Sequence, residues 1–162
     1  MVFSLLFLAL TLPADVSMHI RLETILDSTQ AKVGDPIVGV LVKDAKLKGK
    51  IVLPKKTIVR GHIRLLDLAK DRVTIGLELE EAESPDTKAK FAANLEEIVS
   101  TLPGMGHFEH GSLNRSSPNA QDVSATDPIL PNNSPGLGTF FVLGSKFKLR
   151  DLEMVWRTLP AN

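Results

Sequence analysis

The stretch from Ala31 to Leu66 constrains the fold more than any other part of the sequence. It contains short apolar, β-branched runs at Ile37–Val42, Ile51–Leu53 and Thr57–Leu66, each bounded by glycine, proline or polar turn residues. Glycine tolerates positive φ, whereas proline fixes φ and cannot donate to a β-ladder, so these residues separate strands. Several short strands at this spacing indicate a small barrel or a sandwich.

Alternation of apolar and polar residues predicts further strands on both sides of this stretch. In Val16–Glu23 the apolar residues occupy every second position, which is typical of a half-buried strand. Thr57–Leu66 alternates as well, and Arg72–Glu81 follows it after a polar turn, so the two runs predict a β-hairpin. Gly61 falls on the inward side, where a missing side chain permits a bend or a close backbone approach.

Other segments complete the predicted fold. Ile37–Val42 is apolar at successive positions, which suits a strand buried on both faces, and Lys43–Lys50 is predicted to be a polar connection. Lys88–Glu96 keeps a period of two, and we favour a strand over the helix that its alanine and glutamate residues would also suit. Residues 147–157 predict a final hairpin, in which Trp156 closes the core.

Length and composition predict one domain with a long loop. Residues 102–138 are rich in proline, glycine, serine and asparagine, which is typical of a flexible loop or insertion. Residues 13–101 and 139–159 then form a single domain, a small closed or partly closed β-barrel whose last strand pairs with an early one. A chain of 162 residues buries about 70% of its unfolded surface, so it needs no metal or disulfide to fold. Cysteine is absent, which excludes disulfides and thiolate chemistry.

Residues 1–12, MVFSLLFLALTL, are almost entirely apolar. The run is too short to span a bilayer as a helix. It resembles the apolar part of a signal peptide, with cleavage near Ala9–Thr11, although no lysine or arginine precedes it. The alternatives are a hydrophobic first strand or a start placed inside a longer chain, and we favour export.

The overall charge is balanced, but one region is locally basic. Lysine plus arginine and aspartate plus glutamate both number 19, so no global field steers the chain toward nucleic acid or an anionic membrane. A basic run nevertheless extends from Lys43 to Arg64. Its candidate binding face comprises Lys50, Lys55, Lys56, Arg60, His62 and Arg64.

Small β-barrels bind nucleic acid through such a face when aromatic residues accompany the cations. Here the pattern places the aromatic residues in the core instead. An acidic set on the following strands comprises Glu78, Glu80, Glu81, Glu83, Glu96 and Glu97. Cross-strand pairing on a solvated surface explains both sets of charges, and we favour that interpretation.

Histidines provide the nearest approach to a metal site. His107–His110 contains two histidines and a glutamate, which are zinc-ligand types, but their spacing does not match a helical zinc motif and they lie in the predicted loop. His19 and His62 fall on outward strand faces and would meet only if their strands were neighbours. We therefore expect no metal site.

Catalytic signatures are also missing from the sequence. There is neither a G-x-S-x-G nucleophile elbow nor a glycine-rich phosphate loop. Glu78, Glu80 and Glu96 would be candidates for the paired carboxylates of a glycosidase, but no cleft is indicated beside them. We expect no enzymatic activity, no catalytic residues and no cofactor.

Short segments also form a recurring pattern. They are Leu12–Pro13, Ile20–Glu23, Asp27–Ser28, Ala31–Pro36, Gly49–Pro54, Val59–Gly61, Gly138–Val142 and Met154–Thr158. This pattern is similar to uncharacterised exported β-domain proteins of acidobacteria and related Gram-negative bacteria, over residues 12–100 and 136–159. Lys55–Lys56 stands where that group usually has a glycine after the proline, so the turn type is expected to differ.

More distantly, the portion from Val33 to Gly61 resembles the C-terminal β-barrel domain of conjugation and type IV secretion channel proteins. The further motifs and the membrane-crossing helical insertion of that family are not recognisable here. The resemblance therefore implies a β-barrel fold and an envelope setting, but no secretion role and no catalytic residues.

The sequence thus predicts a non-enzymatic binding or scaffolding domain that is exported to the periplasm or the outer membrane. Its partner is expected to be another envelope protein or a polymer, and its association with a membrane is expected to be peripheral at most. The alternative is a small nucleic-acid-binding β-barrel that uses the Lys43–Arg64 face, which the missing aromatic residues disfavour.

Overall fold

The computed structural model describes residues 9–99, 105–109, 112–114, 136–144 and 146–161, and within these ranges the chain forms strands and turns without a helix. The strands are β1 (Ala9–Thr11), β2 (Ser17–Leu22), β3 (Leu26–Asp27), β4 (Pro36–Leu41), β5 (Ala45–Leu47), β6 (Lys50–Leu53), β7 (Ile58–Leu68), β8 (Arg72–Glu83), β9 (Lys88–Lys90), β10 (Ala93–Ile98), β11 (Met105–Glu109), β12 (Ser112–Asn114), β13 (Leu137–Leu143), β14 (Lys148–Leu149) and β15 (Glu153–Thr158).

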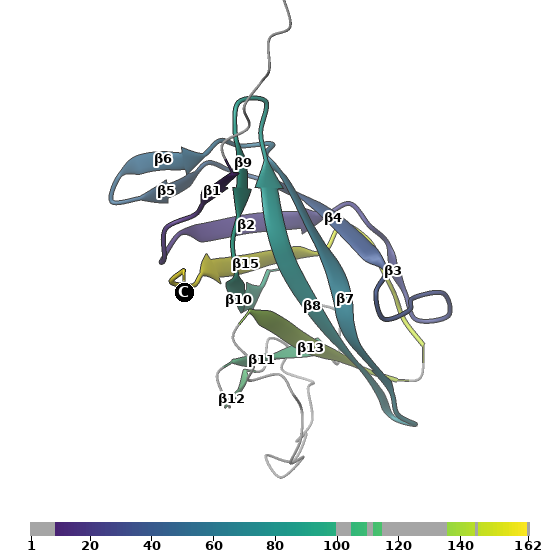
Figure 1. Cartoon of the computed structure of the whole chain (residues 1–162). Coiled ribbons are helices and arrows are strands. Elements are labelled where there is room, and N and C mark those ends of the chain that lie inside the picture. Colours follow the sequence, from purple (N-terminus) through teal and green to yellow (C-terminus); the bar gives the residue numbers. More distant parts are fainter. Residues whose placement is uncertain (1–8, 100–104, 110–111, 115–135, 145, 162) are drawn as a thin grey trace, which may run out of the picture.

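One curled sheet dominates the molecule (Figure 1). Its strands follow the order β10-β15-β2-β4-β7-β8-β13-β11-β12, with β9 paired to β8 and β1 paired to β9. Two smaller sheets, β5 with β6 and β14 with β3, lie outside this path. The curled sheet forms a half-barrel, so the predicted all-β, partly closed barrel is confirmed.

The β7–β8 hairpin is the longest element of the sheet and matches its prediction. Val59 and Ile63 are buried, whereas Arg60 is exposed, as the alternation requires. A Cβ atom on Gly61 would lie 1.9 Å from the carbonyl oxygen of Glu78, and the register shifts between Arg60 and Gly61. Gly61 therefore permits the close backbone approach that the sequence predicts.

Closure of the half-barrel depends on β15. This strand pairs with β10 on one side and with β2 on the other, so the last strand does return to an early one. Trp156 on β15 is fully buried, and a Cβ atom on Gly138 of β13 would lie 2.2 Å from its ring. The missing side chain lets β13 pack against the indole, which brings the two ends of the curled sheet together.

Several predicted elements differ in the structure. Lys43–Lys50 contains β5, which pairs with β6 in a hairpin, so it is more than a polar connection. The predicted final hairpin is wrong, because β14 pairs with β3 and β15 pairs with β2 and β10. On β4, Ile37 and Leu41 are buried but Val38 and Val40 are only half-buried, so burial on both faces is also wrong.

Two other segments are more divided than the sequence suggests. Lys88–Glu96 forms β9 and β10 rather than one strand, because the chain passes from a pairing with β8 to a pairing with β15 between them. Within the predicted loop 102–138, β11 and β12 form, and β13 begins at Leu137. Backbone pairing between β11 and β13 needs no periodic apolar pattern, so composition does not reveal it. Residues 102–104, 110–111 and 115–135 lie outside the described residues.

The described part of the N-terminal segment belongs to the sheet. β1 pairs in parallel with β9, the Leu12 backbone N–H donates to the Lys90 carbonyl at 3.1 Å, and Leu12 is buried. A first strand thus forms over Ala9–Thr11, where the sequence also predicts cleavage. Residues 1–8 lie outside the described residues, and export stays a prediction.

Candidate functional site

The predicted binding face is divided between two hairpins. Lys50 opens β6, and Lys55 and Lys56 follow this strand in the turn that leads to β7. Arg60, His62 and Arg64 lie on the outward side of β7. We call residues Lys43–Lys56, which contain β5 and β6, the basic hairpin, and we call β7 with β8 the paired hairpin.

Arg60, His62 and Arg64 of the paired hairpin all contact glutamates of β8. Arg60 forms an ion pair with Glu83, which is near its register position. Arg64 contacts Glu78 through Nε at 2.7 Å and Glu80 through Nη2 at 2.6 Å. The cross-strand pairing that the sequence favours is therefore present.

Glu80 lies at the centre of this network. Its Oε1 is 3.0 Å from His62 Nδ1 and also accepts the bond from Arg64. Burial raises the pKa of the Glu80 carboxyl, but the hydrogen bonds and charges of His62 and Arg64 together lower it more, so the net pKa is below the ordinary value. Hydrogen bonds from Arg64 to Glu78 and Glu80 raise the pKa of the Arg64 guanidinium in turn.

Two further members of the acidic set, Glu81 and Glu96, also form ion pairs. Glu81 contacts Lys88 Nζ at 3.3 Å, and Glu96 on β10 pairs with Arg157 on β15. Glu96 therefore lies on a different part of the sheet from Glu78 and Glu80, which both contact the Arg64 side chain.

The basic hairpin presents its charges differently. Its six lysines are Lys43, Lys46, Lys48, Lys50, Lys55 and Lys56, and all six side chains are exposed. Within the described part of the chain, none of them forms an ion pair with a carboxylate. The one acidic residue among them, Asp44, accepts the Lys55 backbone N–H at 2.7 Å.

The turn at the tip of this hairpin places a lysine in an unusual backbone conformation. Leu47 pairs with Lys50, and the two residues between them, Lys48 and Gly49, have φ values of 50° and 80°. Positive φ at both central positions is the type I′ geometry, for which asparagine followed by glycine is the preferred pair. A lysine therefore occupies a left-handed position that favours glycine or asparagine.

A second lysine of the basic hairpin shares this property. Lys56 has a φ of 74°, in the turn that Thr57 closes by donating Oγ1 to the Pro54 carbonyl at 2.7 Å. This is the turn whose type was expected to differ because glycine is missing. In the structure the backbone at Lys56 is left-handed, although the residue carries a side chain.

The base of the basic hairpin is anchored to the barrel. Ala45 and Leu53 are almost fully buried, and the Lys56 backbone N–H donates to the Leu41 carbonyl at 2.9 Å. Toward the tip the apolar residues become accessible. Ile51 is 56% exposed and lies opposite Lys46, so the end of the hairpin combines cations with an open apolar side chain.

The structure does not bring the predicted histidines together. His19 on β2 and His62 on β7 are separated by β4. Burial and the charge of Lys43 lower the pKa of His19, while Glu97 and Glu153 oppose this shift.

His107–Glu109 lies on β11, rather than in the loop that the sequence predicts. His110 falls outside the described residues, and among the residues that are described no group of three suitable side chains could hold a metal ion.

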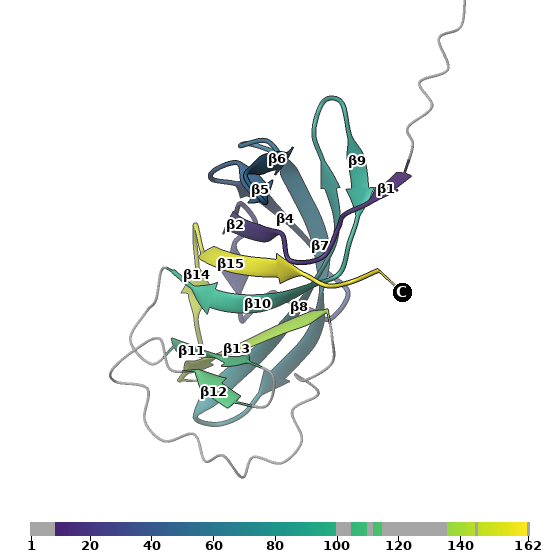
Figure 2. The same ribbon diagram turned by 90° about the vertical axis from the view of Figure 1, so that its left-hand side faces the viewer.

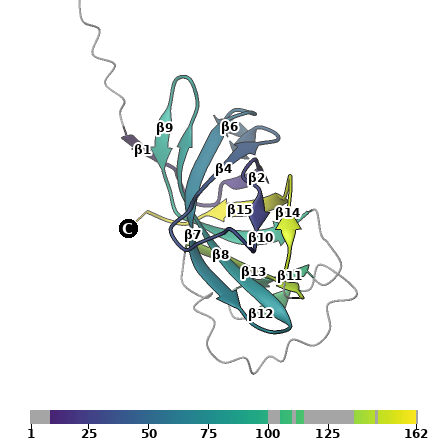
Figure 3. The same cartoon turned by 90° about the vertical axis from the view of Figure 1, so that its right-hand side faces the viewer.

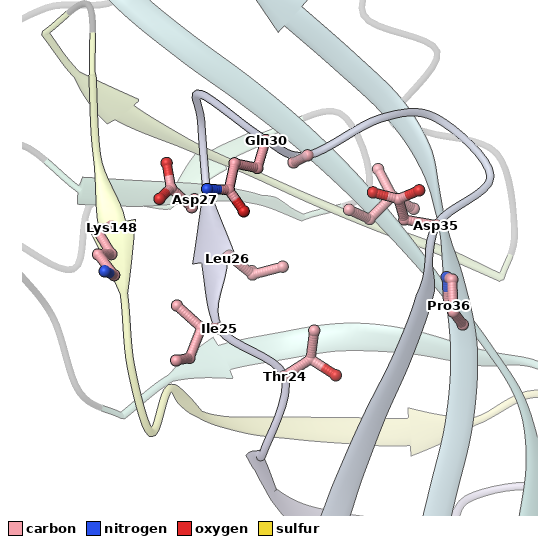
Figure 4. A pocket seen from close by; sticks show the side chains of 10 residues that line it. Thr24, Ile25, Leu26, Asp27, Gln30, Asp35, Pro36 and Lys148 are labelled. Carbon is pink, nitrogen blue, oxygen red and sulfur yellow. The ribbon is translucent and has the colours of Figure 1, made fainter.

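A pocket that the sequence does not indicate lies beside β3 (Figure 4). It measures about 370 Å³ and separates Asp27 and Lys148 on one side from Asp35 and Pro36 on the other. Gln30 contributes an amide to its lining. Its residues come from three separated parts of the chain, so no local motif could have revealed it.

The carboxylates of this pocket accept hydrogen bonds from the turn that connects β3 to β4. Asp27 Oδ1 accepts the backbone N–H and the hydroxyl of Thr29, at 2.9 and 2.7 Å, and these bonds lower the pKa of the Asp27 carboxyl. Asp35 Oδ2 accepts the Lys32 N–H at 2.9 Å. The carboxylates thus shape turns, and the basic hairpin remains the better candidate for a functional surface.

No helix among the residues described is long and apolar enough to cross a membrane. The resemblance to exported β-domain proteins and to secretion channel proteins stays a prediction. Comparison of the chain with protein-family models, with curated proteins and with solved structures finds no match.

Proposed function

We propose that this chain is a non-enzymatic binding or scaffolding domain of the cell envelope, and that the basic hairpin holds an anionic partner. The observation that carries the proposal is the set of six exposed lysines on one projecting hairpin. Unlike the cations of the paired hairpin, these lysines have no ion-pair partner among the described residues. A partner that supplies carboxylates or phosphates would therefore find these charges available.

The envelope setting rests on the sequence. The apolar residues 1–12 and the resemblance to exported β-domain proteins both support it. The binding role is further supported by the carboxylates, because Glu78, Glu80 and Glu96, the candidates for an acid–base pair, lie in ion pairs with arginines.

Fractionation of the source cells tests this proposal with the full chain. A variant with Lys48, Lys50 and Lys56 changed to glutamine is compared with a control in which Lys32, Lys70 and Lys146 are changed, so that both lose the same charge. All six positions are exposed. We expect the parent and the control in the envelope fraction, with an N-terminus shortened by processing, and the hairpin variant released from it. An intact Met1 in the cytosol, or equal retention of both variants, would overturn the proposal.

The second candidate is a nucleic-acid-binding barrel, and the lysines of the basic hairpin favour it. The placement of Phe140, Phe141 and Trp156 argues against it, because these rings are fully buried and cannot stack on bases. This function predicts an affinity for oligonucleotides whose log–log salt slope is about −0.7 to −0.9 for each phosphate contacted. A lack of binding at low salt removes it.

A further inference from the structure

We infer that the basic hairpin docks on the surface of an anionic lipid bilayer. This inference rests on the proposed function and names the partner of the same surface. Its carrying observations are the position of the hairpin, the backbone conformation of two of its lysines, and the exposed isoleucine beside them.

The position of the hairpin leaves its tip free to approach a flat surface. β5 and β6 form their own two-stranded sheet, outside the path of the curled sheet. They lie at the end of the molecule opposite to β11 and β12 in Figure 1, and the views in Figure 2 and Figure 3 agree. The connection between β8 and β9 reaches further at this end, whereas β5 and β6 project to the side of the barrel, so a flat surface would meet the basic hairpin from that side.

The left-handed backbone at Lys48 and Lys56 suggests that the positive charges of these two side chains have a role on this surface. Lys48 has a φ of 50° and Lys56 a φ of 74°, although glycine would adopt either conformation without steric cost. Strained backbone of this kind persists where the side chain has a role. Both lysines flank β6, one at each end, so the strain and the charge occur together on the proposed surface.

The exposed isoleucine distinguishes a bilayer from other anionic partners. Ile51 is 56% exposed and lies opposite Lys46, while Leu47 and Val52 beside it are half-buried. Surfaces that bind the membrane interface combine lysines with apolar side chains that enter the boundary between headgroups and acyl chains. A purely electrostatic partner gains nothing from an open isoleucine between the lysines.

The hollow at the base of the hairpin has the polarity that a phosphate headgroup needs. It measures about 390 Å³ and is lined by Lys43, Lys46, Ser17 and Asp44. Two ammonium groups and a hydroxyl can face a phosphate. Asp44 also lines this hollow, but its Oδ1 accepts the Lys55 N–H and so is partly occupied.

The balanced net charge of the chain does not oppose docking. Lys43–Lys56 contains six lysines and one aspartate, a local charge of +5 within a chain of net charge +0. Salt screens charges beyond about 10 Å at moderate ionic strength, so a surface senses the nearby lysines first. The glutamates of β8 lie in ion pairs with Arg60, Arg64 and Lys88, outside the basic hairpin.

Vesicle co-sedimentation of the full chain tests the inference. The probes are vesicles of phosphatidylglycerol mixed with phosphatidylcholine, and vesicles of phosphatidylcholine alone. We expect binding to the anionic vesicles only. The glutamine variant at Lys48, Lys50 and Lys56 should lose about a hundredfold in affinity, since each lysine near an anionic surface contributes about fivefold. The charge-matched variant at Lys32, Lys70 and Lys146 should bind as the parent does.

A second pair of variants tests the apolar contribution. Ile51→Ser should weaken binding about tenfold, because half of a large apolar side chain is lost from the interface. The control is Leu68→Ser, since Leu68 is 60% exposed on the paired hairpin, and its binding should be unchanged. Circular dichroism confirms that each variant is folded.

The outcomes separate this inference from the proposed function. Absence of vesicle binding, or equal loss in the two lysine variants, overturns the bilayer as partner. So does an unchanged affinity of Ile51→Ser together with binding of the parent to a soluble polyanion, which would assign the lysines to an acidic polymer or protein. If the lysine variant is still released from the envelope fraction in cells, the proposed function stands with such a partner.

Discussion

The two hairpins that carry the basic residues show opposite ways of placing charge on a β-structure. In the paired hairpin, Arg60 and Arg64 lie across from glutamates of the neighbouring strand, and His62 joins the same network. In the basic hairpin, the register of β5 and β6 places Lys46 opposite Ile51 and Lys50 opposite Leu47, and Lys48 and Lys56 occupy backbone positions that glycine prefers. Position along a basic run is therefore a poor guide to which cations are available to a partner.

The difference arises from the strand that pairs with each basic strand. β7 pairs along its length with β8, whose second half carries Glu78, Glu80, Glu81 and Glu83. β6 has only β5 as a neighbour, and the outward residues of β5 include Lys46. Cross-strand pairs between opposite charges stabilise a sheet, and the register of β5 and β6 provides no such pair for Lys46 or Lys50. The paired hairpin is thus built for stability, and the basic hairpin for contact.

The largest loss of stability is expected at Gly61 of the paired hairpin, and Gly49 of the basic hairpin provides the comparison. Gly61→Ala should lower the free energy of unfolding by about 3 kcal/mol, because the new Cβ would meet the Glu78 carbonyl oxygen and only backbone movement could relieve this overlap. Gly49→Ala has nothing within 4 Å of the new Cβ and suffers only from its φ of 80°, so about 1 kcal/mol is expected. Urea unfolding measures both, and equal losses would contradict the contrast.

Lys56→Gly should stabilise the protein by about 1 kcal/mol, because glycine adopts the left-handed backbone without steric cost. Lys56→Gln removes the same charge but keeps a side chain at a φ of 74°, so it should leave the stability nearly unchanged. Urea unfolding of the two variants separates backbone strain from charge. A stabilisation of the same size in both would assign the effect to repulsion among lysines instead.

Glu80→Gln should cost less than about 1 kcal/mol at neutral pH, because the network that it weakens is partly exposed. The pKa of Glu80 is lowered in the folded state, so its contribution is present above the ordinary glutamate pKa and is lost as pH falls through the folded value. The parent should therefore lose stability over this acidic range more steeply than the variant does. Parallel curves of unfolding free energy against pH would contradict the assignment.

The smallest effect concerns His19, whose pKa is lowered by burial and by Lys43 at the base of the basic hairpin. The unfolded state then binds the proton more readily, so stability should decline slightly as pH falls from the ordinary histidine pKa through the folded value. Lys43→Gln should raise the pKa of His19, and NMR titration of the ring measures it. Lys70→Gln serves as the control, and an equal shift there would refute a local field.

Local sequence patterns predicted many strands of the barrel but few of the pairings between strands that are distant in the sequence. The β7–β8 hairpin and the close approach at Gly61 follow from alternation and from one glycine, because both are properties of neighbouring residues. The pairing of β14 with β3 joins residues more than a hundred positions apart, and no residue type marks it. The predicted final hairpin failed for this reason.

The sequence predicts the basic region of the candidate site, but it does not predict that this region is divided between the basic hairpin and the paired hairpin. The run from Lys43 to Arg64 is basic in the sequence, and the glutamates that pair with its second half were recognised as an alternative explanation. The left-handed conformations of Lys48 and Lys56 are visible only in three dimensions, since lysine carries no preference for such positions. The glycine that follows Lys48 was the available sign of a tight turn there.

The position of β15 has a consequence for how the molecule is made. β2, near the start of the described chain, obtains its second neighbour only from Glu153–Thr158, and β10 is hydrogen-bonded to no other described strand. During synthesis the apolar faces of both strands therefore emerge long before their partner does. Long loops must close before this pairing is rewarded, so folding should be slow. The apolar faces of β2 and β10 thus stay uncovered until β15 has been synthesised.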